Sequence, residues 1–242
     1  MANQTHLFAL AITTPLPNNL VPDSQLTLTD TDLLHRVTTV LRLGIGEQLI
    51  LFDQQQTVTL ELTQLTKKTL TGVVHSAIPI TQPLPKIKLY IGLPKREAFE
   101  SIVYSAGQLG VASIIPVITQ KTHRNWITSK DHDRLLRIAL AGCEQAKQFV
   151  IPELRTPVNF TQAITDATPA VGFVCDVMGA PAITAHGQPA DTPLDLWIGP
   201  EGGFTVEELA ALIAAGIAPL RLTPTILRSQ DAVLAALAIL RA

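Results

Sequence analysis

The sequence contains little cysteine, few aromatic residues and few charges. Its two cysteines, Cys143 and Cys175, lie far apart, and neither belongs to a Cys-x-x-Cys pair. This excludes the usual ligand sets for zinc, iron–sulfur clusters and thioredoxin-type chemistry, and we predict no metal site. Charged residues make up 16% of the chain and aromatic residues 5%, against 47% hydrophobic residues. Such an aliphatic composition is typical of a globular protein and excludes disorder or a disulfide scaffold.

The sequence also lacks long hydrophobic runs. No window holds 18 uncharged apolar residues, and residues 1–13 have no basic segment that would begin a signal peptide. We therefore expect a soluble, cytoplasmic protein without a signal peptide, a membrane span or a membrane partner. The length of 242 residues fits two domains.

Positive charge is concentrated in one part of a chain whose net charge is −2. Residues 86–155 contain eleven Lys and Arg and six Asp and Glu, so this segment carries +5 and the remainder carries −7. The asymmetry favours nucleic-acid binding by one face, although the net charge alone argues against it. Six cations in loops and helix starts are either solvated or available to contact phosphates. They are Arg36, Arg42, Lys95, Arg96, Lys121 and Arg124.

The residue pattern divides the chain into two domains and a linker. Residues 1–76 show mostly strand signals, such as the alternation in Thr57–Leu62, with one helix from about Thr31 to Gly44. A small β-barrel carrying one helix is the simplest packing. Residues 77–85 include three prolines and are predicted to form an extended linker.

Residues 86–242 follow a different pattern, in which strands alternate with helices. This alternation predicts an α/β domain whose largely parallel sheet is covered by helices on both faces. The last helix, about 231–240, is almost entirely apolar and must be buried, either in the core of its own domain or against a second subunit.

The glycine loop, Gly199–Phe204, lies between a buried strand and a helix that begins with a capping box at Thr205. In a parallel sheet this position is at the carboxyl edge, where such folds bind ligands. The spacing differs from the dinucleotide motif Gly-x-Gly-x-x-Gly, and no Gly-Lys-Ser/Thr follows, as a phosphate loop requires. The glycines either let a ligand approach the backbone closely or serve only a turn with positive φ.

A second candidate segment, Thr223–Ser229, follows the next strand at the same edge. It places Arg228 at the amino end of the apolar last helix, where the helix dipole disfavours a cation. This unfavourable position favours a functional role for Arg228 over that of a solvated residue.

These segments resemble a known family. Leu196–Phe204, Glu207, Glu208 and the Leu-Arg-Ser at 227–229 are similar to the C-terminal motifs of ribosomal RNA small subunit methyltransferase E. That family consists of 16S rRNA uridine N3-methyltransferases and belongs to the SPOUT superfamily. Further similarity spans nearly the whole chain and includes residues 35–43, 46–47, 108–111 and 143–145.

The resemblance implies a fold, a cofactor and partners. It implies a PUA-like RNA-binding barrel in residues 1–76 and a SPOUT domain with a C-terminal trefoil knot in residues 86–242. Knots are rare, and no periodicity in the sequence predicts one. The implied cofactor is S-adenosylmethionine, and the implied partners are the 16S rRNA of the small ribosomal subunit and a second copy of the chain.

The cofactor would be held mainly by backbone groups of two loops at the carboxyl edge, because glycine and proline leave the amides there unobstructed. The predicted cofactor-binding residues are Ile198, Gly199, Pro200, Glu201, Gly202, Gly203, Leu222, Thr223, Ile226 and Leu227.

Two residues are candidates for the chemistry. Methylation of uracil N3 requires loss of the N3 proton while negative charge grows on O2 and O4. Arg228 would stabilise that charge by hydrogen bonds. Glu201 is the nearest carboxylate in the motif and would act as the base, although capping of the next helix is an equally good interpretation.

The chain departs from the family pattern at Ser105 and Gln108, where members often carry Lys and Glu, and at Gln230 and Asp231. These departures favour slightly an alternative function, an RNA-binding homologue with an altered target or lost catalysis. A third possibility is a small-molecule α/β enzyme that binds a nucleotide phosphate with the glycine loop. The missing phosphate-loop lysine argues against it.

Overall fold

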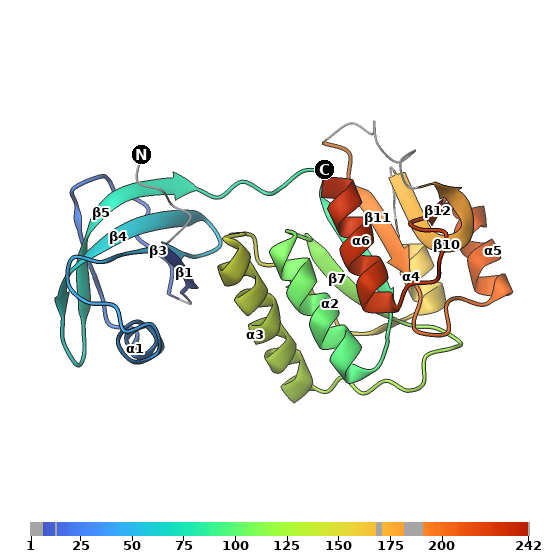
Figure 1. The fold of residues 1–242 in the computed structure, drawn as a ribbon, viewed down its shortest axis with the longest axis horizontal. Helices are drawn as coiled ribbons and strands as arrows, with labels where there is room; N and C mark the ends of the chain where they lie inside the picture. The colour runs from blue at the N-terminus through green and yellow to red at the C-terminus, as the bar shows by residue number, and fades with distance from the viewer. Residues whose placement is uncertain (1–6, 13, 168–170, 182–190, 242) are drawn as a thin grey trace. The chain divides into compact units, whose positions relative to one another are not determined.

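A computed structural model describes residues 7–12, 14–167, 171–181 and 191–241. The chain divides into two compact units, Met1–Thr81 and Gln82–Ala242 (Figure 1). Met1 and Ala242, the outer limits of the predicted domains, lie outside the described residues. The boundary between the units falls within the predicted linker, but residues 77–79 continue the last strand of the first unit.

The first unit is built on a five-stranded sheet. Its strands are β1 (Phe8–Ala11), β2 (Gln25–Leu28), β3 (Gln48–Phe52), β4 (Gln56–Leu65) and β5 (Leu70–Pro79). They pair in the order β1-β3-β4-β5-β2, and every pair is antiparallel except β1–β3. Leu49 and Leu51 of β3 and Leu60 and Leu62 of β4 are fully buried in one hydrophobic core.

The helix of the first unit differs from the sequence prediction in its hydrogen bonding. Only Thr31–His35 (α1) is α-helical, and Arg36–Val40 (η2) continues as a π-helix. Asp30 caps the start by accepting hydrogen bonds from the backbone of Asp32 and Leu33. The run of β-branched residues Val-Thr-Thr-Val in η2 fits an α-helix poorly.

The second unit has strands and helices in alternation. The elements are β6 (Ile87–Gly92), α2 (Arg96–Gln108), β7 (Ser113–Ile118), α3 (Ser129–Ala146), β8 (Glu153–Leu154), β9 (Val158–Asn159), α4 (Phe160–Asp166), β10 (Val171–Pro181), β11 (Leu194–Ile198), α5 (Val206–Ala214), β12 (Ala218–Arg221) and α6 (Ser229–Arg241). The strands pair in the order β12-β10-β11-β6-β7-β8, and β9 also pairs with β7. All these pairs are parallel, which confirms the predicted α/β sheet.

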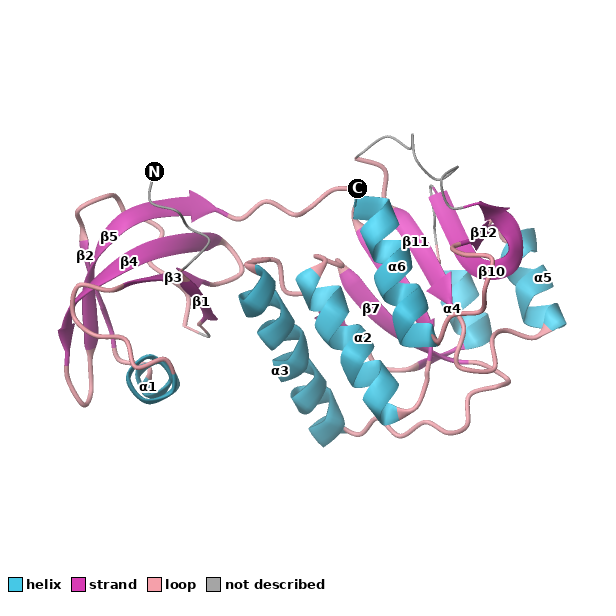
Figure 2. Ribbon diagram, viewed as in Figure 1, coloured by secondary structure: helices cyan, strands magenta, loops and turns pink. Residues whose placement is uncertain are grey.

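Helices cover both faces of this sheet. Figure 2 shows α2, α3 and α6 side by side on one face, where they pack on residues such as Leu89 and Leu196. On the other face, Tyr90 and Trp197 pack with residues of α4 and α5. The rings of Tyr90 and Trp197 are stacked with their centroids 4.2 Å apart.

The sequence prediction missed three elements, β8, β9 and α4, which lie between α3 and β10. Two of them are strands of only two residues, too short for an alternating pattern to be recognised. The helix α4 has seven residues and no side-chain cap at its start. Such short elements depend on packing against β7 rather than on a local sequence signal.

One carboxylate is buried in the sheet. Asp195 of β11 is 1% exposed, and its Oδ2 has no hydrogen-bond partner. Burial raises the pKa of Asp195 to about 6, against the opposing effect of the Lys88 charge on β6. The folded protein therefore binds a proton at Asp195 more tightly than the unfolded chain does.

This burial makes stability depend on pH. Between the ordinary pKa of Asp195 and about 6, stability should fall as the pH rises, because the buried side chain must then ionise. We expect Asp195→Asn to raise the free energy of unfolding at pH 8 by about 3 kcal/mol, since one pKa unit corresponds to about 1.4 kcal/mol. At pH 4 the gain should vanish. Urea denaturation of this variant and of the exposed control Asp191→Asn measures the effect, and a gain that does not vary with pH would contradict it.

Candidate functional site

A cavity of about 390 Å³ lies at the carboxyl edge of the sheet in the second unit. Because the strands are parallel, residues 175–177 of β10 and the loops after β11 and β12 come together at this edge. These segments and the start of α6 form the walls. The ten residues that the sequence predicts as cofactor-binding all line this cavity; they are Ile198, Gly199, Pro200, Glu201, Gly202, Gly203, Leu222, Thr223, Ile226 and Leu227.

The glycine loop forms the first wall and is tightly packed. A Cβ atom on Gly199 would lie only 2.9 Å from the Cα of Gly203, so the loop has no room for a side chain there. Gly203 has φ of +66°, which favours glycine, and its N–H donates to the carbonyl of Pro200 at 2.8 Å. The positive φ of Gly203 fits the interpretation of these glycines as a turn, and all three line the cavity. Close approach of a ligand stays a prediction.

The second wall is the segment between β12 and α6. The hydroxyl of Thr223 donates to the carbonyl of Thr225 at 2.7 Å, which closes a short turn beside the cavity. Ile226, two residues before Arg228, is 87% exposed. This wall thus presents a rigid backbone turn and an uncovered apolar side chain.

The cavity also contains residues of β10 that were not predicted from the sequence, namely Cys175, Asp176 and Val177. Ser229, the last residue of the second candidate segment, enters from α6. Burial raises the pKa of the Cys175 thiol to about 12, helped by the Asp176 charge, so the thiol is not a nucleophile at neutral pH. Ser229 is 4% exposed, and its hydroxyl has no hydrogen-bond partner. The signal that could have identified the β10 residues is that a parallel strand beside β11 reaches the same edge of the sheet.

Glu201 caps a helix, but a different one from the helix that follows it. Its Oε1 accepts a hydrogen bond of 3.0 Å from the backbone N–H of Lys95, at the start of α2. The next helix, α5, is capped instead by Thr205 and Glu208 in a capping box. A residue 106 positions away supplies the cap of α2, which has no side-chain cap of its own.

Arg228 lies beside the cavity rather than in its wall. It is exposed and immediately precedes α6, and its carbonyl accepts a hydrogen bond of 2.8 Å from Ala232. Its neighbours Leu227 and Ser229 both line the cavity, whereas Arg228 is not among the lining residues. Arg228 therefore adjoins two lining residues in sequence without lining the cavity itself.

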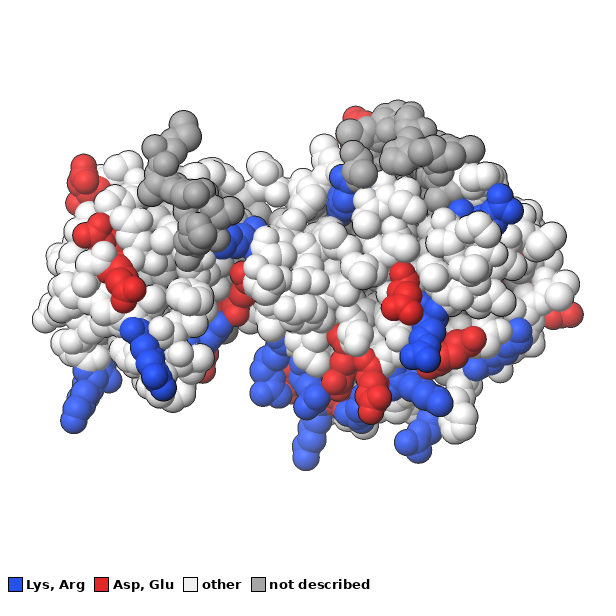
Figure 3. All heavy atoms as spheres, viewed as in Figure 1, with Lys and Arg blue, Asp and Glu red and all other residues white. Residues whose placement is uncertain are grey.

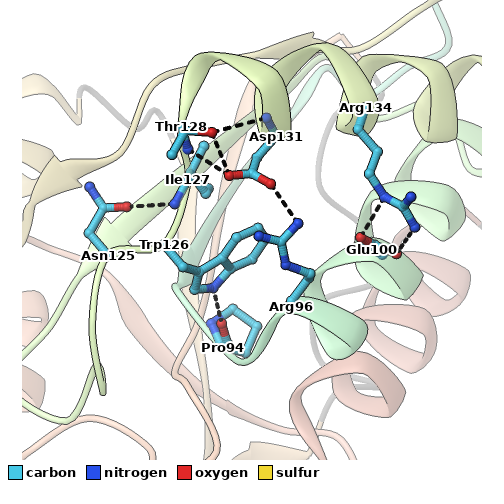
Figure 4. A network of polar contacts seen from close by, with 9 residues as sticks. All are labelled: Pro94, Arg96, Glu100, Asn125, Trp126, Ile127, Thr128, Asp131 and Arg134. Carbon is cyan, nitrogen blue, oxygen red and sulfur yellow. Dashed lines mark hydrogen bonds and ion pairs between the residues drawn. The ribbon is translucent and has the colours of Figure 1, made fainter.

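Arg96, one of the six candidate phosphate contacts, is engaged within the protein (Figure 4). Its guanidinium lies 4.7 Å from the ring centroid of Trp126 and 2.5 Å from Asp131 at the start of α3. Hydrogen bonds from Thr128, together with Arg96, hold the pKa of Asp131 at about 2. These contacts join the starts of α2 and α3.

Lys121, another of the six candidates, contacts the glycine loop. Its ammonium donates to the carbonyls of Gly202 at 2.8 Å and Phe204 at 3.2 Å. The side chains of Arg42, Lys95 and Arg124 are exposed. Arg36 is half-buried in η2, in the first unit.

The described part of the chain holds neither a metal-binding cluster nor a membrane-spanning helix. Among the residues that the structure describes, no three His, Cys, Asp or Glu side chains are grouped so that they could hold a metal ion. Within the same ranges, no helix has the length and hydropathy needed to cross a membrane.

Comparisons with known proteins agree on one family. The model of a family described as an RNA methyltransferase domain matches residues 81–241. A Synechocystis protein named ribosomal RNA small subunit methyltransferase E is 28% identical over 237 residues, covering 96% of this chain and 77% of the relative. A Legionella pneumophila protein described as a methyltransferase, solved with bound SAM, is 30% identical with a TM-score of 0.80, covering 97% of this chain and 96% of that one. Ribosomal RNA small subunit methyltransferase E from Neisseria gonorrhoeae, at 24% identity, shares the fold with a TM-score of 0.81 and 96% coverage of each chain.

The contact of Glu201 with α2 predicts a loss of stability on truncation. We expect Glu201→Ala to lower the free energy of unfolding by about 1 kcal/mol, because the N–H of Lys95 loses its acceptor. Glu201→Gln should retain most of the stability, since its amide oxygen can accept the same bond. Urea denaturation compares the three proteins, and equal stability of the Ala variant and the wild type would refute the capping role.

Proposed function

The chain belongs to the RNA methyltransferase family and to its branch of ribosomal RNA small subunit methyltransferase E, and from this we propose that it transfers a methyl group from S-adenosylmethionine to N3 of a uridine in 16S rRNA. The observation that carries the proposal is the cavity at the carboxyl edge, with the glycine loop and the segment 222–227 as facing walls. We further propose that the protein acts in the cytoplasm, on small-subunit RNA.

The residues of the cavity fit S-adenosylmethionine. Its volume of about 390 Å³ is within the range for small-molecule sites. The buried hydroxyl of Ser229 has no partner in the protein and is available to a polar group of a ligand. A Cβ on Gly203 would meet no atom within 4 Å, so the backbone there is open to close approach. When bound, the cofactor supplies an activated methyl group on its sulfonium.

The protein's own part in the reaction is to position the uridine and to compensate charge. Uracil N3 becomes a nucleophile only after its proton leaves, while negative charge grows on O2 and O4. Arg228, exposed between two residues that line the cavity, is the proposed donor of hydrogen bonds to those oxygens. We propose that Glu201 acts as the base and that its Oε2 accepts the N3 proton, because its Oε1 already accepts a hydrogen bond from the backbone N–H of Lys95.

We propose that RNA binds to both units. In the second unit, Lys and Arg side chains gather, with Asp and Glu among them, along the side where α2 and α3 begin (Figure 3). This side includes Lys95 and belongs to the segment that carries +5. In the first unit we propose a PUA-like RNA-binding barrel to which Arg36 and Arg42 contribute phosphate contacts.

A C-terminal knot and a homodimer are part of the same proposal. The return of α6 from the edge strand β12 to pack on α2 and β11 supports a knotted path. Met178 is 88% exposed, Ile226 87% and Leu234 of α6 48%. We propose that a second copy of the chain covers these exposed apolar side chains.

The departures from the family pattern do not weaken the enzyme proposal. Ser105, Gln108, Gln230 and Asp231 are not among the residues that line the cavity. Gln108 donates a hydrogen bond to Gln145 instead, which joins α2 to α3. A role in packing between helices accounts for that position without involving catalysis.

The first test concerns the cofactor. Gly199→Val should abolish binding of S-adenosylmethionine measured by calorimetry, because a side chain at this position collides with Gly203. Gly44→Val is the matched control, since the nearest atom to a Cβ there is 3.7 Å away. Unchanged affinity in the Gly199 variant would refute the assignment of the cavity.

The second test concerns catalysis. Arg228→Ala should reduce kcat about 100-fold or more, while the affinities for RNA and cofactor remain near wild type, because the charge on O2 and O4 is left unpaired only in the transition state. Arg228→Lys should recover part of the rate. The assay uses labelled S-adenosylmethionine with unmodified 16S rRNA and small subunits, and mass spectrometry locates the methyl group. A wild-type rate in the Ala variant would exclude the catalytic role.

A further inference from the structure

The turn after β7, Thr119–Thr122, contacts the glycine loop although β7 is two strands away from β11 in the sheet. The turn is closed on itself, because the N–H of Thr122 donates to the carbonyl of Thr119 at 3.1 Å and the N–H of Thr119 donates to the hydroxyl of Thr122 at 3.0 Å. It is therefore a compact unit at the end of a buried strand.

Lys121 extends from this turn along the outer side of the glycine loop. A Cβ on Gly202 would lie 3.1 Å from Cδ of Lys121, so the stem of the lysine lies against that glycine. Its ammonium donates to the carbonyls of Gly202 and Phe204 at 2.8 and 3.2 Å. Two of its three donors are thus used within the protein, on carbonyls that flank Gly203.

Glu208 makes a second connection between the same two segments. It is only 4% exposed. Its Oε1 accepts from the N–H of Gln120 at 2.8 Å, and its Oε2 accepts from the N–H of Thr205 at 2.9 Å. A buried carboxylate is stable only when its oxygens are hydrogen-bonded, so this side chain fixes the turn and the end of the glycine loop in one geometry.

We propose that the turn Thr119–Thr122 is a strap that holds the glycine loop in its ligand-binding geometry, with Lys121 and Glu208 as positioning residues. The loop contains Gly202 and Gly203, which lose more conformational entropy on ordering than other residues do. A loop that is ordered before the ligand arrives binds it more tightly. The identity of the ligand, S-adenosylmethionine, rests on the proposed function; the strap itself does not.

The test replaces the lysine by a side chain of similar length that cannot donate. Lys121→Met keeps the apolar stem and removes the two hydrogen bonds, and Lys130→Met is the control, an exposed lysine of α3. The first readout is hydrogen exchange of the ligand-free protein. We expect the Gly203 amide, which donates to Pro200, to exchange about tenfold faster in the Lys121 variant only.

The second readout is ligand binding. We expect Lys121→Met to raise the Kd and KM for S-adenosylmethionine about tenfold at nearly unchanged kcat, with a thermal midpoint within about 4 °C of wild type. Glu208→Gln should act in the same direction, because its amide group can accept only one of the two backbone hydrogen bonds. If Lys121→Met still binds RNA with the wild-type salt dependence, Lys121 acts on the glycine loop and not on RNA phosphates.

The outcomes separate the strap from the other assignments. Unchanged exchange of the Gly203 amide in Lys121→Met overturns the strap. The strap is also overturned if exchange and cofactor affinity stay at wild-type values while the salt slope of RNA binding falls by about one, because Lys121 is then a phosphate contact. Faster exchange in the variant, with no cofactor binding by the wild type, would leave the strap standing and refute the proposed function.

Discussion

The site of this protein depends on the common direction of the strands in the second unit. Because all of them run parallel, residues 175–177 of β10 and the loops after β11 and β12 meet at one edge of the sheet, although Cys175 and Leu227 are 52 positions apart in the chain. The cavity forms where these segments meet at that edge. It would not exist in a sheet with antiparallel neighbours, where successive loops alternate between the two edges.

The glycine loop combines two requirements that are physically opposed. It must present bare backbone, which requires Gly199 and Gly203, and it must hold a fixed geometry, which glycine opposes. The surrounding charged side chains resolve this conflict. Glu201 fastens the loop to α2, and Lys121 and Glu208 fasten it to the turn after β7. These three charged side chains thus hold the backbone of the glycine loop in place.

Several charges of the basic segment are balanced within the protein. Arg96 forms an ion pair with Asp131. Arg134 forms a bidentate ion pair with Glu100, in which Nε and Nη2 donate to the two carboxylate oxygens at 2.9 and 3.0 Å. Lys121 is bonded to carbonyl groups. The net charge of +5 for residues 86–155 already counts the acids in these pairs. Of the eleven Lys and Arg in the segment, Arg96, Lys121 and Arg134 are engaged within the protein, so fewer than eleven are available to an RNA backbone.

The sequence by itself determined the elements with long periodic patterns, such as α2 and α3, and it marked the two loops of the cavity through Gly199 and Arg228, because glycine and a cation at a helix start are local signals. It missed α4 and the π-helical turn at Arg36–Val40, whose form depends on packing and on β-branched crowding. The partners of Glu201 and Lys121 were decided only by the tertiary structure. Their contacts join residues 106 and 81 positions apart, and the strand order that brings them together is not encoded in any local pattern.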